Sequence, residues 1–388
     1  MKRSDFLMAL PGATELAALP AQPAAEREPR TLAPYGAPSQ FESSVVRLPR
    51  GVATPALTPL AKQLGIITPS GLTFTRTHAG VPQLDPRNYR LLVHGMVTKP
   101  LEFSLADIMR FPAVERIHFL ECSGNSARGW EALGMGVQFS HGLVSCCSWT
   151  GVPLRTVLAE AGIHPEASWV VVESADGAAY DRSIPFSRAS DALLVYGQNG
   201  EMLRPEQGYP LRLLVPGFEG SANVKWLRRL KAVAAPVYSR EETAQYTQPG
   251  PDGKIALFDL VMKVKSVIVS PSPGSTLAPR GFVEARGFAW SGRGKIVAVD
   301  VTIDGGASWS PATLDPLVLT QSFTRFTFPL HVGERPLTIG SRARDESGDI
   351  QPTLTQLIAV RGPALRYHVN AIAFWRIDTE GRVVHAAR

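Results

Sequence analysis

Proline and glycine interrupt this chain so often that few long helices can form in it. The sequence holds 32 prolines and 34 glycines among its 388 residues, and its aromatic content is modest. Proline removes a backbone donor and glycine is conformationally permissive, so both residues break helices and mark turns. The composition therefore favours a loop-rich fold with many strands over a helical bundle.

The first large part of the chain has the pattern of strands mixed with short helices. Apolar runs predict strands over residues 90–94, 115–120, 169–173 and 209–215, and helical spacing predicts helices over residues 105–110 and 153–161. The two kinds of element do not alternate regularly enough for a doubly wound sheet. We therefore expect residues 60–240 to form one α+β domain.

A stretch of turn-forming residues follows this domain. Tyr246-Thr-Gln-Pro-Gly-Pro-Asp-Gly253 has the composition of a loop, and we expect residues 241–260 to be a linker. Short apolar runs then predict strands over residues 265–269, 281–285, 296–303, 323–328, 336–339 and 357–360. Their regular spacing predicts that residues 261–388 form an all-β sandwich of immunoglobulin type.

The start of the chain is rich in alanine and proline. Met1-Lys-Arg precedes a short apolar stretch that Pro11 and Glu15 interrupt, and this N-terminal stretch lacks the two consecutive arginines of a twin-arginine signal. We interpret residues 1–59 as an N-terminal arm with, at most, a degenerate or truncated export signal. No stretch approaches the roughly 20 apolar residues that span a bilayer, so no membrane span is expected.

The formal net charge of +6 is spread thinly along the chain. No run of five or more Lys and Arg residues occurs, and aromatic residues do not alternate with basic ones as in base-stacking surfaces. This pattern argues against a nucleic-acid partner. A mild basic excess instead suits an anionic ligand or an acidic partner.

The three cysteines do not form a disulfide framework. Cys146 and Cys147 are adjacent, and they would point to opposite faces of a strand. Cys122 stands where an apolar run breaks into a Ser-Gly-Asn turn, a place where a thiol can meet a metal or an electrophile. Taken alone, Cys122 could equally be a buried structural cysteine. No CxxCH motif occurs, so the chain itself is not expected to hold a c-type haem.

Several stretches form one ordered pattern around Cys122. They include Phe74-Thr-Arg76-Thr-His78, Glu121-Cys122-Ser-Gly-Asn125, Ser148-Trp149-Thr-Gly, Leu194-Val-Tyr196-Gly, Gly208-Tyr-Pro-Leu-Arg212 and Val224-Lys225-Trp226-Leu227. Together they resemble the sulfite oxidase family of molybdenum enzymes, in order from about residue 65 to residue 388. Arg204-Pro-Glu-Gln-Gly-Tyr-Pro210, His141-Gly-Leu-Val and the extension after Arg361 resemble the SoxC-type molybdenum subunit of sulfane dehydrogenases within that family.

The resemblance implies a molybdenum–molybdopterin cofactor in the first domain and dimerisation through the sandwich. It makes Cys122 the protein ligand of the metal, and a soft thiolate suits a high-valent metal. The implied catalytic residues are Arg76, Trp149, Tyr196 and Arg361. The implied cofactor-binding residues are His78, Ser123, Asn125, Arg212, Asn223 and Lys225.

Each of these roles has a structural alternative. Arg76 could be a solvated surface charge rather than an anion clamp. His78 could be a core histidine, and Tyr196 and Trp149 could serve packing alone. The alignment of Arg361 with a family arginine is the weakest of the set.

Two positions depart from the family pattern. Ala127 stands five residues after Cys122, where sulfite oxidases carry an arginine, and Arg128 follows it. Gln207 stands where several members have histidine. Less fixed positive charge weakens the case for free sulfite, so we expect a sulfane sulfur bound to a carrier protein, because remote contacts can supply its binding energy.

The resemblance also implies partners and a location. Electrons would pass to a separate c-type cytochrome, two chains would pair as a homodimer, and the protein would be periplasmic. The alternatives are a dehydrogenase of free sulfite, a sulfoxide reductase on the same scaffold, and a cofactor-free scaffold that only binds partners.

Overall fold

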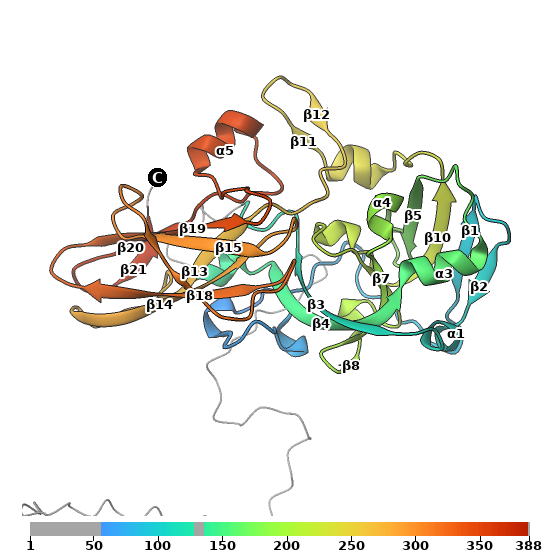
Figure 1. Ribbon diagram of the computed structural model, residues 1–388, viewed down its shortest axis with the longest axis horizontal. Helices are drawn as coiled ribbons and strands as arrows, with labels where there is room; N and C mark the ends of the chain where they lie inside the picture. Colours follow the sequence, from blue (N-terminus) through green and yellow to red (C-terminus); the bar gives the residue numbers. More distant parts are fainter. Residues whose placement is uncertain (1–55, 128–135, 387–388) are drawn as a thin grey trace, which may run out of the picture. The chain divides into compact units, whose positions relative to one another are not determined.

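The computed structural model describes residues 56–127 and 136–386. Most of the predicted N-terminal arm and Arg128 lie outside these ranges. The described chain is rich in strands and its helices are short (Figure 1). The predicted α+β class, with a mixed first part followed by a β-sandwich, is confirmed.

The first part of the described chain contains ten strands and four short α-helices. The strands are β1 (Leu91–Gly95), β2 (Leu101–Phe103), β3 (Val114–Glu121), β4 (Val144–Pro153), β5 (Trp169–Ser174), β6 (Asp181–Pro185), β7 (Leu193–Gln198), β8 (Glu201–Met202), β9 (Arg212–Leu214) and β10 (Leu227–Val233). The helices are α1 (Leu105–Met109), α2 (Val137–His141), α3 (Leu154–Ala161) and α4 (Phe186–Ala189).

These strands form one mixed sheet and one antiparallel sheet. One has the order β2-β1-β10-β5-β6, in which β1 and β10 run parallel and the other neighbours antiparallel. The other has the order β3-β4-β7-β8, with β9 also paired to β7. The predicted strand over residues 209–215 is real but shorter, because only β9 pairs.

Helix α3 shows why a short helix forms between these sheets. Leu154, Val157, Leu158 and Ala161 recur at helical spacing, and all four are buried. Gly162 follows with φ +68°, a left-handed conformation that ends the helix. The apolar face of α3 therefore packs onto a core that the strands share.

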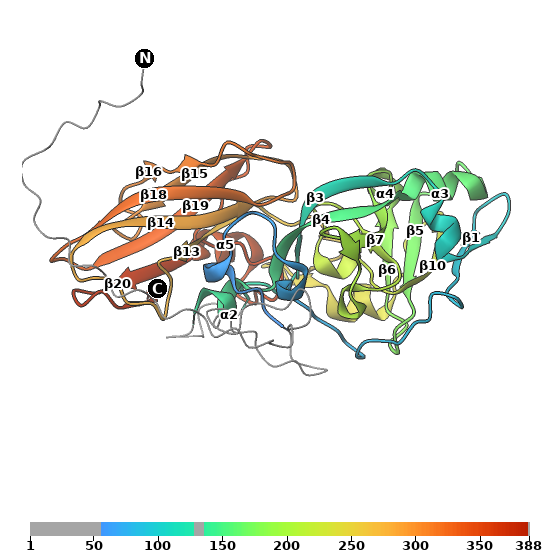
Figure 2. The same ribbon diagram turned by 90° about the horizontal axis from the view of Figure 1, so that it is seen from below.

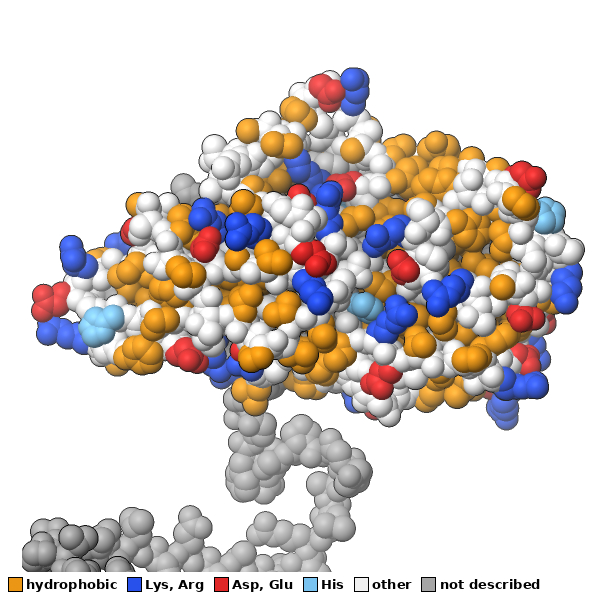
Figure 3. All heavy atoms as spheres, in the orientation of Figure 1, with side chains coloured by type: hydrophobic (Ala, Val, Ile, Leu, Met, Phe, Trp, Pro, Cys, Tyr) orange, Lys and Arg blue, Asp and Glu red, His pale blue; other side chains and the backbone are white. Residues whose placement is uncertain are grey.

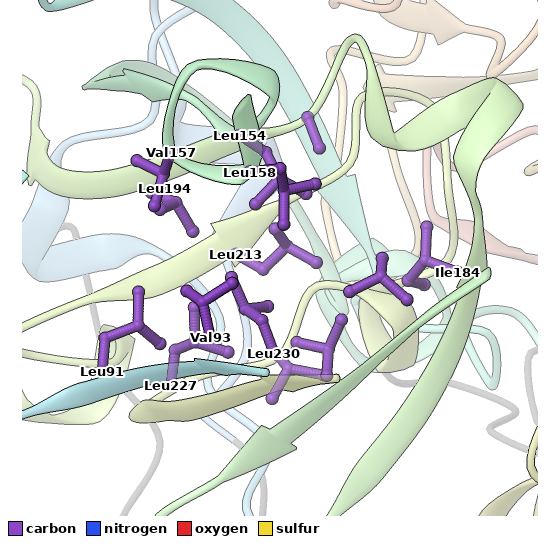
Figure 4. Packing of buried hydrophobic residues seen from close by; sticks show 14 of the residues in the cluster. Leu91, Val93, Leu154, Val157, Leu158, Ile184, Leu194, Leu213, Leu227 and Leu230 are labelled. Carbon is purple, nitrogen blue, oxygen red and sulfur yellow. The ribbon is translucent and has the colours of Figure 1, made fainter. Parts of the chain in front are cut away.

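That core joins residues from both sheets. Figure 4 shows the side chains of β1 and β10 facing those of α3 and of β7 and β9. The residues labelled there are Leu91, Val93, Leu154, Val157, Leu158, Ile184, Leu194, Leu213, Leu227 and Leu230. Each is at most 4% exposed. This cluster fixes the strands whose ends carry the site described below.

The second part of the described chain is a sandwich of two antiparallel sheets (Figure 2). Its strands are β13 (Lys265–Ser270), β14 (Gly281–Trp290), β15 (Ile296–Thr302), β16 (Ser310–Pro311), β17 (Thr313–Leu314), β18 (Thr324–Val332), β19 (Leu337–Asp345), β20 (Phe374–Ile377) and β21 (Val383–His385). The sheet orders are β13-β14-β18-β17 and β16-β15-β19-β20-β21. A small hairpin of β11 (Gln248–Pro249) and β12 (Ile255–Ala256) precedes them.

The prediction of a strand over residues 357–360 is wrong. These residues belong to helix α5 (Leu354–Arg361), which begins with a capping box between Thr353 and Gln356. Gly362 follows with φ +80° and ends it. A run of four apolar residues fits a strand or a buried helix equally well, and only the cap residues separate the two. The domain boundaries at residues 59, 240 and 260 stay a prediction.

Strand β3 and strand β4 pack on both faces. Phe119 and Cys146 belong to a cluster with residues of the sandwich, whereas Leu120 and Cys147 belong to a separate cluster in the first part. The adjacent cysteines therefore point to opposite faces, as the sequence predicts, and both are free thiols. The C-terminal end of β3 thus lies between two cores.

The surface carries charges of both signs. Figure 3 shows basic and acidic side chains interspersed over the face it presents. No helix among the described residues is long and apolar enough to cross a membrane.

We expect Leu213→Ala to lower the free energy of unfolding by about 2–5 kcal/mol, because it opens a cavity in a fully buried position. Urea unfolding followed by circular dichroism measures this change. Leu64→Ala, at a residue 79% exposed, is the control and should change stability by less than about 0.5 kcal/mol. Equal unfolding midpoints for the two variants would contradict the core assignment.

Candidate functional site

Cys122 begins a tight turn at the end of β3. Its backbone N–H donates to the Leu143 carbonyl at 2.9 Å, and its carbonyl accepts from the Asn125 N–H at 2.9 Å. These bonds hold the turn against the start of β4. The thiol faces a cavity, and burial raises its pKa. Without a metal the sulfur is therefore a protonated thiol at neutral pH.

Six of the predicted site residues line this cavity together. They are Arg76, His78, Cys122, Arg212, Asn223 and Lys225. They come from segments far apart in the sequence: the loop before β1, the end of β3, strand β9 and the stretch before β10. The sequence pattern thus correctly predicted that these residues converge, while their individual roles stay predictions.

Arg212 forms the buried floor of the cavity. It is 1% exposed and donates to the carbonyls of Gln207 at 2.9 Å and Asn223 at 3.1 Å. Its guanidinium carbon lies 5.2 Å from the Trp149 ring centroid, and its Nε has no hydrogen-bond partner among the residues described. Burial lowers the pKa of Arg212 to about 10. The cation is therefore fixed in place with an unused donor.

Lys225 adds a second cation beside it. Its Nζ donates to the carbonyl of Arg76 at 3.1 Å and of Glu206 at 3.0 Å, and it lies 4.3 Å from the Trp226 ring centroid. Burial, followed by the charge of Arg212, lowers the pKa of Lys225 to about 7. Neutral carbonyls satisfy its donors but do not balance its charge. An anion in the cavity would do so.

Arg76 and His78 stand at the more exposed side of the cavity. Arg76 Nη1 donates to the Thr77 carbonyl at 2.5 Å. The His78 ring stacks on Tyr180 at 5.7 Å, and its Nε2 lies 3.0 Å from the Tyr246 hydroxyl. Burial, followed by the charge of Arg76, lowers the pKa of His78. His78 is therefore neutral at pH 7 and can share a proton with Tyr246.

The tyrosines of the cavity are Tyr180 and Tyr246, which sequence reasoning missed. Tyr246 lies in the segment predicted to be a linker, directly after a π-turn over Glu241–Gln245. Glu242 anchors this segment, since it is buried and accepts from the Ser183 N–H at 2.6 Å. The surrounding turn residues gave no sign of an anchored segment. Only the burial of Glu242 distinguishes this segment from a linker, and the sequence does not reveal that burial.

Two predicted catalytic aromatics lie elsewhere. Tyr196 is not among the cavity residues, and its half-buried side chain packs against the main core of the first part. Trp149 does not line the cavity either. It is 1% exposed, donates through Nε1 to the His118 carbonyl at 3.1 Å, and supports Arg212. Both side chains thus have packing contacts, and the catalytic roles predicted for them stay predictions.

Three further predicted residues act around the cavity wall. Asn125 donates to Glu121 Oε1 at 2.9 Å and accepts from the Leu143 N–H at 3.1 Å, so it braces the Cys122 turn. The Ser123 hydroxyl is buried without a partner among the described atoms. Arg361 donates to the His368 carbonyl at 2.9 Å and pairs with Asp259 at 3.5 Å. None of the three lines the cavity.

The residues present fit a metal-bearing anionic group. Cys122 offers one soft ligand, and a bound metal would displace its proton. Arg212, buried, and Lys225, half-buried, offer positive charge, with the free Nε of Arg212 as a donor. Asp176 is also in the lining. The fold and site are therefore those of an enzyme that can hold a metal-bearing, anionic cofactor.

Comparison with known families and proteins agrees. Residues 78–240 match the oxidoreductase molybdopterin binding domain, and residues 257–374 match the Mo-co oxidoreductase dimerisation domain. The crystal structure of the sulfane dehydrogenase SoxCD from Paracoccus pantotrophus superposes with a TM-score of 0.91 at 38% identity, covering 97% of this chain and 100% of that one. The chain belongs to the sulfite oxidase family of molybdenum enzymes.

Vertebrate sulfite oxidases are similar to this chain at a comparable level of sequence identity. Mitochondrial sulfite oxidase from Homo sapiens is 34% identical over 324 residues, which is 76% of this chain and 59% of that protein. Sulfite oxidase from Gallus gallus is 34% identical over 314 residues, 74% of this chain and 68% of that protein. The chain thus spans about three fifths to two thirds of these relatives.

We expect the cofactor-free chain to become more stable as pH rises from about 7 to 9. The folded-state pKa of Lys225 lies below its unfolded value, so the unfolded chain binds the extra proton in this window and unfolding becomes less favourable with rising pH. Lys225→Met should flatten the slope of unfolding midpoint against pH. Lys231→Met, at an exposed lysine on β10, is the control. Equal slopes in wild type and Lys225→Met would contradict the burial of this charge.

Proposed function

We propose that this chain is the molybdenum subunit of an enzyme that oxidises sulfane sulfur held on a carrier protein's cysteine. The observation that carries the proposal is the cationic cavity around Cys122, which combines a soft ligand, a buried arginine, a half-buried lysine and two tyrosines. In this proposal electrons leave to a separate c-type cytochrome.

Distinct residues would hold the two ends of the cofactor. Cys122 would ligate the metal, while Arg212 and Lys225 would bind the pterin phosphate through charge-assisted hydrogen bonds. When bound, the molybdenum cofactor supplies the transfer of oxygen and of two electrons. The protein contributes fixed charges and a closed floor, since Arg212 cannot move away from Trp149 and its carbonyl partners.

The exposed side of the cavity would receive the sulfur. Arg76 can bind an anionic sulfur group through its guanidinium fork. The Tyr246 hydroxyl and neutral His78, 3.0 Å apart, can accept and pass on a proton there. In this arrangement the sulfur compound meets one cation, Arg76, and a neutral pair that can transfer a proton. It is not enclosed by positive charge.

The place of the family's missing arginine supports a carrier-bound substrate over free sulfite. Ala127 packs against an apolar cluster of Leu357, Leu365 and Val369, which belongs to α5 and the extension after it. Gln207, neutral, is buried and donates to Thr73 Oγ1 and the Phe74 carbonyl, both at 3.0 Å. Two positions that would add positive charge are thus neutral. Contacts distant from the reacting sulfur would then supply binding energy.

The name of the SoxCD structure, a sulfane dehydrogenase, favours the same substrate class. The names of the vertebrate relatives favour free sulfite, which is the second candidate. A third candidate, a cofactor-free scaffold, would contain no molybdenum after expression in a host that makes the cofactor. The match to a dimerisation domain supports a homodimer that pairs through the sandwich. A periplasmic location is part of the same proposal.

We expect Cys122→Ser to abolish turnover while the fold is retained, because a hydroxyl is a poor replacement for a soft thiolate. Turnover with cytochrome c as acceptor, molybdenum content and circular dichroism measure the effect. The control is Cys146→Ala, which removes a buried thiol from the cluster shared with the sandwich and should keep the activity. Full activity in Cys122→Ser would refute the ligand assignment.

We also expect kcat/KM to be at least about tenfold higher for a persulfide-loaded carrier protein than for free sulfite. A tenfold ratio corresponds to about 1.4 kcal/mol of additional transition-state binding. Steady-state reduction of cytochrome c with each substrate measures the ratio. The carrier without its persulfide is the control. A kcat/KM for free sulfite that matches or exceeds that for the loaded carrier would make the chain a sulfite dehydrogenase.

A further inference from the structure

Glu121 is a fully buried acid directly before the metal-ligand position. Its side chain is 0% exposed. Oε1 accepts from Lys265 Nζ at 2.5 Å and from Asn125 Nδ2 at 2.9 Å, and Oε2 accepts from Trp290 Nε1 at 2.7 Å. Both carboxylate oxygens are thus satisfied by directed donors. A carboxylate held in this way has one orientation.

The two outer donors come from the sandwich and form a rigid pair. Lys265 begins β13, Trp290 ends β14, and the two residues are direct partners in the antiparallel register. They are 1% and 0% exposed, and the ammonium lies 5.9 Å from the indole centroid. Because both side chains stand on paired strands of one sheet, neither can follow the Cys122 turn if it moves.

The rest of the turn is held from the same part of the chain. Lys265 Nζ also lies 3.4 Å from Ser126 Oγ, and the His368 N–H donates to the Ser123 carbonyl at 2.8 Å. Residues on either side of Cys122 are therefore tied to the C-terminal half. The thiol lies between these ties.

Stability alone is a weak reason for such an arrangement. A buried ion pair seldom stabilises a protein more than apolar residues of the same size, because both charges must be desolvated. Its better-attested value is specificity, since the pair permits one geometry and penalises others. Here the residue so constrained is adjacent to the metal ligand.

We propose, on the premise that Cys122 is the metal ligand of the proposed function, that Glu121 is a positioning residue which fixes the direction of the Cys122 sulfur. Lys265 and Trp290 hold Glu121 from the sandwich. The sandwich therefore takes part in setting the geometry of the metal centre in addition to any role in dimerisation.

The test uses the holoenzyme of full length with the double substitution Glu121→Gln and Lys265→Met. It removes both charges together, so no uncompensated charge stays buried, and the glutamine can still accept from Trp290. We expect a folded protein that binds molybdenum, with an altered paramagnetic resonance spectrum of the half-reduced metal and a kcat lowered about 10- to 100-fold. The spectrum reports the metal–sulfur geometry and is unaffected by a loss of stability elsewhere.

Two single variants keep the test decisive. Trp290→Phe removes the indole donor to Glu121, together with part of the buried ring, and should shift the spectrum in the same direction by a smaller amount, even if the double variant fails to fold. Ser291→Ala removes the 2.6 Å hydrogen bond to Asp345 at the next position of the chain, and should lower the unfolding temperature without changing the spectrum. Wild-type spectra in folded, molybdenum-loaded Trp290→Phe and in the double variant would overturn the proposal.

The outcome for Cys122→Ser separates this proposal from the proposed function. If Cys122→Ser loses the wild-type spectrum and the Glu121 variants keep it, only the positioning role fails. If Cys122→Ser itself keeps the wild-type spectrum, the ligand assignment fails and the positioning role fails with it.

Discussion

The packing of β3 on both faces is the constraint on which the site depends. Phe119 is held in the sandwich core and Leu120 in the core of the first part, so the strand cannot slide or rotate without opening one of them. Glu121 and Cys122 follow directly and are therefore held in place by the same packing. A thiol at the end of a strand fixed in this way reaches the cavity in a defined place, which a metal ligand requires.

The cavity is graded in charge and exposure. Arg212 is buried and Lys225 half-buried, and backbone carbonyls hold both, whereas Arg76 is half-buried and His78 is exposed. Fixed, poorly compensated cations suit a resident cofactor that never leaves. More exposed groups suit a substrate that must enter and depart.

Motif order in the sequence predicted much of this arrangement, but not the contacts that complete it. The convergence of Arg76, Cys122 and Lys225 followed from residues quoted in order, and most strands followed from apolar alternation. Tyr246 was missed because turn residues surround it and its anchor, Glu242, is recognisable only once its burial is known. The 357–360 helix was missed because four apolar residues carry no period. The role predicted for Tyr196 stays a prediction, and its side chain packs against the main core of the first part.

The contact between Glu121 and Lys265 lay beyond sequence for a related reason. The two residues are 144 positions apart, and each is an ordinary charge in its own context. Their meeting depends on the register that pairs Lys265 with Trp290, which in turn depends on where β13 and β14 begin and end. Once that register is set, the acid beside Cys122 has a partner on a sheet from a different part of the fold. The part of the chain that matches a dimerisation domain thereby also holds the turn that carries Cys122, because its paired strands β13 and β14 direct one ion pair and one indole donor onto Glu121.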